Sequence, residues 1–141
     1  MASLAAASPP SNQADEESVS TVFTKAYDLY TKLMDSGDDF RTPAFQSEVK
    51  RCILMLEDVT RGVSLLDLFS RNENVREMAT GHIKFFLLPC LLSNLQGKIY
   101  HDPETTTNAR EDTIDMCETY LRDFLQRIKV SLSCFQFYGL K

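Results

Sequence analysis

Two histidines and two pairs of adjacent carboxylates are the residues of this chain whose chemistry could serve catalysis. His82 and His101 are 19 residues apart, and neither belongs to an HExxH or similar ligand pair. Glu57-Asp58 and Glu111-Asp112 occupy neighbouring positions of predicted helices, where side chains diverge by about 100°. We expect solvated helix faces and structural histidines. The chain also lacks GxSxG, GxGxxG and Walker A motifs, so we predict no catalytic residue, no cofactor and no enzyme activity.

The four cysteines, at positions 52, 90, 117 and 134, are spread along the chain. The gaps of 38, 27 and 17 residues contain no CxxC or other clustered spacing, so we predict no metal site. Each cysteine lies in an apolar stretch, which is typical of a buried, reduced thiol. Free thiols suit a reducing compartment, and we therefore expect a cytoplasmic protein.

The composition is that of a globular protein that binds neither nucleic acid nor membranes. The 141 residues suit one domain, and 43% of them are hydrophobic. The formal net charge is −5 and no long basic run occurs, which disfavours nucleic acid and an anionic membrane surface. The longest apolar run, 85–92, has eight residues, whereas a membrane span needs about 20. Residues 1–13 lack the positive and apolar regions of a secretory signal.

The first half of the chain predicts two helices after a disordered tail. Residues 1–14 are rich in Ala, Ser and Pro, which favours disorder. A first helix is predicted to start at the acidic run 15–17, because the helix dipole favours negative charge there. Thr42 and Pro43 predict the N-cap and first residue of the second helix. One apolar face of that helix follows at helical spacing, through Phe45, Val49, Cys52, Ile53, Leu56, Val59, Val63 and Leu66.

The second half predicts two further helices and completes an all-α fold. Thr80 is the candidate cap of the third helix, whose segment 85–92 is apolar all round, as expected in the middle of a bundle. Pro89 lies inside this helix and is predicted to kink it. Four long helices joined by short loops predict an antiparallel bundle over 15–141. The fourth helix has the cleanest periodicity, at Ile114, Cys117, Leu121, Phe124, Ile128, Leu132 and Phe135.

The most distinctive segment runs from Leu65 to Asn74, and it supports two interpretations. It can be a helix–helix connection in which Leu68 and Phe69 enter the core while polar side chains cap the neighbouring helices. It can instead be a polar surface loop that recognises a protein partner. Under the second interpretation the candidate partner-binding residues are Arg71, Asn72 and Glu73.

The same segment resembles the alpha-4 family, also called immunoglobulin-binding protein one or the type 2A phosphatase-associated proteins of TOR signalling. The likeness is closest over Leu66-Asp67-Leu68-Phe69-Ser70-Arg71-Asn72-Glu73. It continues through Thr80-Gly81-His82-Ile83-Lys84-Phe85-Phe86-Leu87-Leu88-Pro89, where the family has a threonine, a Leu-Lys-aromatic triplet and the same proline. Outside 65–89 the helices agree with the family in length, order and pattern more than in residues.

The resemblance implies a non-enzymatic regulatory scaffold. Members of the alpha-4 family bind the catalytic subunits of type 2A, 4 and 6 protein phosphatases and hold them in a latent, protected form. Their N-terminal domain is a bundle of about six or seven antiparallel helices, similar to tetratricopeptide repeats and 14-3-3 proteins. The four helices predicted here are expected to form the first part of such a bundle. The alternative is a generic helical adaptor for another protein partner.

Two departures from the family limit what the resemblance implies. The basic residues by which family members contact phosphatases lie on helices after the fourth. No position here matches them, so we expect weaker binding than that of a full-length relative. A ubiquitin-interacting segment has been proposed in the family's second helix, and Ser64 fits it. However, Val59, Thr60 and Arg61 replace its Ala-Ala-acidic run, which argues against ubiquitin binding.

Missing neighbours also predict exposed apolar surface on the third and fourth helices. In the family's bundle, later helices cover this pair. We therefore expect the chain to self-associate through an apolar patch of several hundred Å². The patch is predicted on the outer face of 85–92 or at Phe124, Ile128, Leu132 and Phe135.

Overall fold

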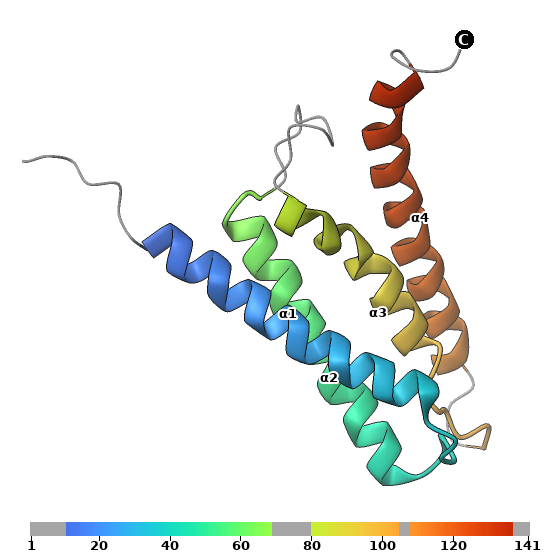
Figure 1. Ribbon diagram of the computed structural model, residues 1–141. Helices are drawn as coiled ribbons and strands as arrows, with labels where there is room; N and C mark the ends of the chain where they lie inside the picture. The colour runs from blue at the N-terminus through green and yellow to red at the C-terminus, as the bar shows by residue number, and fades with distance from the viewer. Residues whose placement is uncertain (1–10, 69–79, 105–107, 137–141) are drawn as a thin grey trace, which may run out of the picture.

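Five helical segments make up the described part of the chain, and no strand occurs in it. The computed structural model describes residues 11–68, 80–104 and 108–136, with the backbone alone at 11–13, 80 and 130–136. The predicted all-α class is confirmed (Figure 1). The segments are α1 (Ser11–Asp35), α2 (Pro43–Leu65), the 3₁₀ helix η1 (Thr80–Leu87), α3 (Leu88–Gln96) and α4 (Ala109–Gln136).

The first helix starts earlier than its acidic run, and the second starts where its cap predicts. α1 begins at Ser11, inside the segment expected to be a tail, directly after two prolines in the sequence. The rest of that expected tail, 1–10, lies outside the described residues. At α2 the Thr42 Oγ1 accepts a hydrogen bond from the Phe45 N–H at 3.3 Å, and Pro43 is the first helical residue. The threonine thereby satisfies one of the unpaired amides of the first turn.

The helices α1 and α2 run antiparallel and pack against each other (Figure 1). They approach closely at Gly62, where a Cβ atom would lie 2.6 Å from Cγ2 of Val19. Glycine costs an isolated helix about 1 kcal/mol relative to alanine, and here its lack of a side chain admits α1. The predicted apolar face of α2 is the buried one: Phe45, Val49, Cys52, Ile53, Leu56, Val59 and Val63.

The predicted third helix is two segments rather than one kinked helix. Thr80–Leu87 forms η1, and α3 starts at Leu88, so Pro89 stands in the first turn of α3. The missing N–H of Pro89 needs no partner there, because the first amides of an α-helix have none within the helix. The prediction that Pro89 kinks a continuous helix is therefore wrong, and the chain changes its helix type at the proline.

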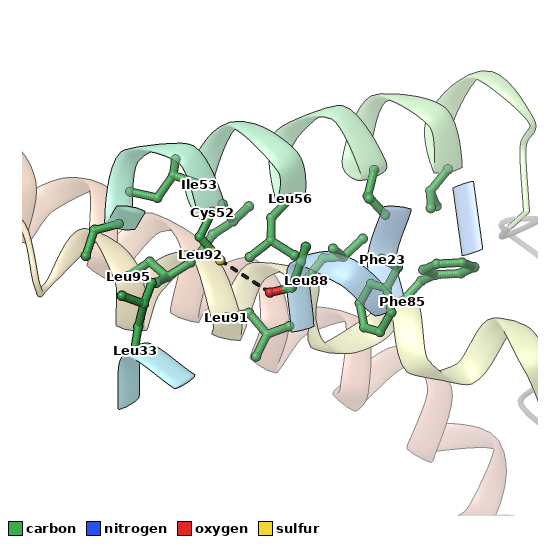
Figure 2. Close-up of a cluster of buried hydrophobic side chains, with 14 of the residues drawn as sticks. Phe23, Leu33, Cys52, Ile53, Leu56, Phe85, Leu88, Leu91, Leu92 and Leu95 are labelled. Carbon is green, nitrogen blue, oxygen red and sulfur yellow. Dashed lines mark hydrogen bonds between the residues drawn. The ribbon is translucent and has the colours of Figure 1, made fainter. Parts of the chain in front are cut away.

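The segment α3 lies between the α1–α2 pair and α4 (Figure 1), which confirms the prediction of a central, apolar helix. Figure 2 shows its leucines beside Leu56 and Cys52 of α2. Phe85 of η1 meets Phe23 of α1 edge to face, with 5.4 Å between the ring centroids. The core is thus shared by α1, α2, η1 and α3; the contributions of η1 and α3 are Phe85, Leu88, Leu91, Leu92 and Leu95.

The helix α4 packs mainly against α3 and η1 (Figure 1). Two reciprocal hydrogen bonds set its rotation about its own axis. Ser93 Oγ donates to the carbonyl oxygen of Cys117 at 3.2 Å, and Cys117 Sγ donates to the carbonyl oxygen of Ser93 at 3.3 Å. The side of α4 that carries Cys117, Tyr120 and Phe124 is therefore half-buried, and no described side chain of α4 is fully buried.

Candidate protein-interaction surfaces

One end of the bundle holds the loop between α1 and α2 against the loop that follows α3. Gln46 of α2 joins them: its Nε2 donates to the carbonyl oxygens of Phe40 at 2.7 Å and Lys98 at 3.0 Å. Its Oε1 accepts a hydrogen bond from the Tyr100 N–H at 3.0 Å. One half-buried amide side chain thus fixes both loops, and we call this region, Phe40, Arg41, Gln46, Lys98 and Tyr100, the loop end.

The loop end presents two aromatic rings and a cation to solvent. Phe40 is 43% exposed and Tyr100 is 40% exposed, and their ring centroids lie 6.2 Å apart in an edge-to-face arrangement. The Arg41 guanidinium carbon lies 5.7 Å from the centroid of the Phe40 ring. Aromatic and arginine side chains are enriched at protein interfaces. The loop end is therefore a candidate surface for a protein partner.

A second candidate surface is an apolar stripe on α4. Ile114, Leu121 and Leu125 are 56%, 41% and 63% exposed. Their spacings of seven and four residues place them on one side of the helix. We call these three residues the α4 stripe. Two of the five described side chains on the apolar face predicted for this helix, Ile114 and Leu121, are thus exposed.

The expected position of the apolar patch on the third and fourth helices needs correction. Phe124 and Ile128 are half-buried beside the rest of the bundle, and the side chains of Leu132 and Phe135 lie outside the described residues. In the segment 85–92 the outer face is exposed at Leu87, which is 42% exposed, and half-buried at Phe86 and Cys90. The residues buried in this segment are Phe85, Leu88, Pro89, Leu91 and Leu92. The exposed apolar surface of α4 lies instead at the α4 stripe.

The predicted partner-binding residues Arg71, Asn72 and Glu73 lie outside the described residues. The chain that leads to them is described as far as Leu68, which is buried, as expected for a residue that enters the core. Asp67 has a φ of 47°, and its N–H donates to the carbonyl oxygen of Ser64 at 3.2 Å. A left-handed residue at this position turns the chain away from the axis of α2.

The two histidines serve separate contacts. His82 Nε2 lies 3.7 Å from Glu16 Oε2 of α1, and His101 Nε2 lies 2.7 Å from Thr113 Oγ1 of α4. Each ring therefore joins two segments of the fold. Among the residues that the structure describes, no three or more His, Cys, Asp or Glu side chains are grouped as ligands for a metal ion. Within the same residues, no helix is both long enough and apolar enough to span a membrane.

The described cysteines, Cys52, Cys90 and Cys117, are free thiols, but only one of them is fully buried. Cys52 lies in the core, and its Sγ donates to the carbonyl oxygen of Ala26 at 3.3 Å (Figure 2). Burial, with a smaller contribution from the Glu48 carboxylate, raises the pKa of Cys52 to about 11. Cys90 and Cys117 are half-buried, so the expectation of burial holds fully for Cys52 alone among these three.

A family model described as the TAP42-like family matches residues 19–132. The chain belongs to the TAP42-like family. The matched range covers α2, η1 and α3 completely and most of α1 and α4. The resemblance seen in the segments 66–73 and 80–89 is thereby confirmed.

A curated protein of related sequence is the serine/threonine-protein phosphatase 4 regulatory subunit ppfr-4 of Caenorhabditis elegans. The two sequences are 30% identical over 105 residues, which is 73% of this chain and 31% of the relative. The chain thus spans about a third of the length of that relative. Its similarity covers most of the bundle described here.

Sequence reasoning missed the loop end. Gln46 is a polar residue in the first turns of α2, and no periodicity shows which carbonyl groups its amide will meet. A weaker signal was present in Phe40, an aromatic residue among Asp, Arg and Thr in a predicted loop. Exposed aromatic residues in loops are candidates for partner contacts.

Proposed function

We propose that this protein is a non-enzymatic regulatory scaffold that binds phosphatase catalytic subunits of types 2A, 4 and 6. The observation that carries the proposal is the 30% identity to a phosphatase 4 regulatory subunit, within a family that matches residues 19–132. That relative is named as a regulatory subunit, which supports a binding role rather than a catalytic one. We propose that the protein acts in the cytoplasm, in TOR signalling.

Two sets of residues are candidates for the phosphatase contact. Arg71, Asn72 and Glu73, which follow α2 in the chain, are the residues that we propose for it. The loop end, which lies beside the first turns of α2, is the competing surface, because it exposes Phe40, Arg41 and Tyr100. The 23 residues of α2 separate its two ends by about 34 Å at 1.5 Å per residue.

A charge-swap experiment tests the proposed contact. Purified catalytic subunits of types 2A, 4 and 6 are immobilised, and the full chain should be retained by at least one of them. Arg71→Glu with Glu73→Arg keeps the net charge but exchanges the positions of the two charges, and retention should fall. The matched control is Arg51→Glu with Glu48→Arg. It reverses an exposed ion pair of 3.4 Å in the first half of α2 and should leave retention unchanged.

Three results separate the alternatives. If none of the three catalytic subunits retains the chain, the proposed function is wrong and a generic helical adaptor is favoured. If Phe40→Ala with Tyr100→Ala abolishes retention while the Arg71 and Glu73 swap does not, the loop end is the contact. If Asn72→Ala lowers the free energy of unfolding by about 0.5–2 kcal/mol and leaves retention unchanged, Asn72 caps a helix instead.

A further inference from the structure

The α4 stripe is fixed in an exposed position by the way that α4 packs. The reciprocal hydrogen bonds between Ser93 and Cys117 hold the Cys117 side of α4 toward α3. Turning Leu121 inward by rotation of α4 would break both of these bonds. Within the described residues the stripe is therefore left exposed to solvent. Burial of apolar area contributes about 25 cal/mol per Å², so cover would be favourable.

The charges of α4 are divided between its two halves, and this division indicates what fits the stripe. Residues 110–118 contain four carboxylates and one arginine, whereas residues 119–129 contain three basic residues and one carboxylate. The helix dipole favours this order by itself. However, Glu111, Glu118, Arg122 and Lys129 follow the stripe along one side of the helix, as their spacing shows. When a second copy of this helix is turned end to end, its basic half faces the acidic half of the first copy.

We propose that α4 pairs with α4 of a second copy of this chain, antiparallel, around a two-fold axis that passes beside Leu121. Residues whose numbers add to about 240 then lie opposite each other. Ile114 of one copy meets Leu125 of the other, and the two Leu121 side chains meet close to the axis. A two-fold interface of this kind uses the same surface on both copies.

The charged residues beside the stripe match in the same register. Glu111 of one copy lies opposite Lys129 of the other, and Glu118 lies opposite Arg122. Glu118 and Arg122 already form an ion pair of 2.6 Å within each helix, with both side chains exposed, so the pairing extends it across the axis. Parallel pairing would instead place the acidic halves together, and like charges at an interface oppose association. The apolar stripe supplies the affinity and the charges select the antiparallel direction.

Sedimentation velocity on the full chain tests the pairing. The wild-type chain should shift with rising concentration from 16.0 kDa to about twice that mass. Leu121→Glu with Leu125→Glu should keep the chain monomeric and raise the dissociation constant at least about a hundredfold, because the dimer would bury four charges without partners. The control is Leu54→Glu, since Leu54 of α2 is 59% exposed and lies outside the stripe. Circular dichroism should show unchanged helix content in both variants.

Zero-length carboxylate–amine cross-linking tests the direction. Within one helix, Glu111 and Lys129 are 18 residues, or about 27 Å, apart. Labelled (¹⁵N) and unlabelled chains are mixed, so that a cross-link between two copies can be recognised by mass. A cross-link from Glu111 of one copy to Lys129 of the other requires antiparallel pairing. A wild-type chain that stays monomeric across the micromolar range would overturn the proposal. So would a dimer that survives the Leu121 and Leu125 substitutions, or one that lacks this cross-link. None of these results depends on phosphatase binding.

Discussion

Gly62→Ala sets helix propensity against packing, and we expect packing to prevail. Alanine should stabilise the isolated helix by about 1 kcal/mol relative to glycine. In the folded protein its Cβ would lie 2.6 Å from Cγ2 of Val19, which is too close for two carbon atoms. Val19 is β-branched and lies within α1, so its χ1 rotamer cannot easily change. Overpacking of this kind costs about 1–3 kcal/mol, and the net effect should be a loss of about 0–2 kcal/mol.

Equilibrium urea unfolding measures this balance, with two comparison variants. Gly37→Ala is the matched control, because no atom lies within 4 Å of a Cβ there and its φ is not positive. It should stabilise the protein by about 0.4–1 kcal/mol through the unfolded state. Val19→Ala combined with Gly62→Ala removes the clash, so a double-mutant cycle should give a favourable coupling of about 0.5–3 kcal/mol. A gain for Gly62→Ala equal to the propensity difference would refute the close approach of α1 and α2.

Three further predictions concern single side chains. The pKa of Cys52 is raised from 9.0 to about 11, so the stability that it contributes is fully present below pH 9 and is lost as the pH rises toward 11. Urea midpoints of the wild-type chain should fall more steeply over this range than those of Cys52→Val. Gln46→Ala removes three hydrogen bonds at the loop end, and hydrogen exchange at the Tyr100 amide should become at least about tenfold faster. Thr42→Ala removes the cap of α2, and chemical denaturation should show a loss of about 0.5–2 kcal/mol.

The buried face of α2 could be predicted from the sequence because one periodic pattern determines it. Seven of the eight residues expected on that face, from Phe45 to Val63, are buried, and Thr42 caps the helix as its type and position predict. Helical spacing places such residues on one side whatever the neighbours are. The family was likewise accessible from local sequence, since the segments 66–73 and 80–89 carry it.

The exposed part of α4 could not be predicted, because its apolar face is wider than one neighbour covers. Spacing gave Ile114, Cys117, Leu121 and Phe124 equal weight. The bundle covers the Cys117 and Phe124 side and leaves Ile114 and Leu121 in solvent. Which side is used depends on the hydrogen bonds with α3, which no periodicity encodes. For the same reason Pro89 predicted an interruption but not the change from a 3₁₀ helix to an α-helix.

The most direct test of the proposed function is titration calorimetry of the full chain against a purified type 4 phosphatase catalytic subunit. This partner is chosen because the relative at 30% identity is a phosphatase 4 regulatory subunit. The account predicts a saturable heat of binding that is weakened by Arg71→Glu with Glu73→Arg and unchanged by the Arg51 and Glu48 swap. An absence of binding heat for the folded wild-type chain, with types 2A and 6 equally silent, would contradict the proposed role as a phosphatase scaffold.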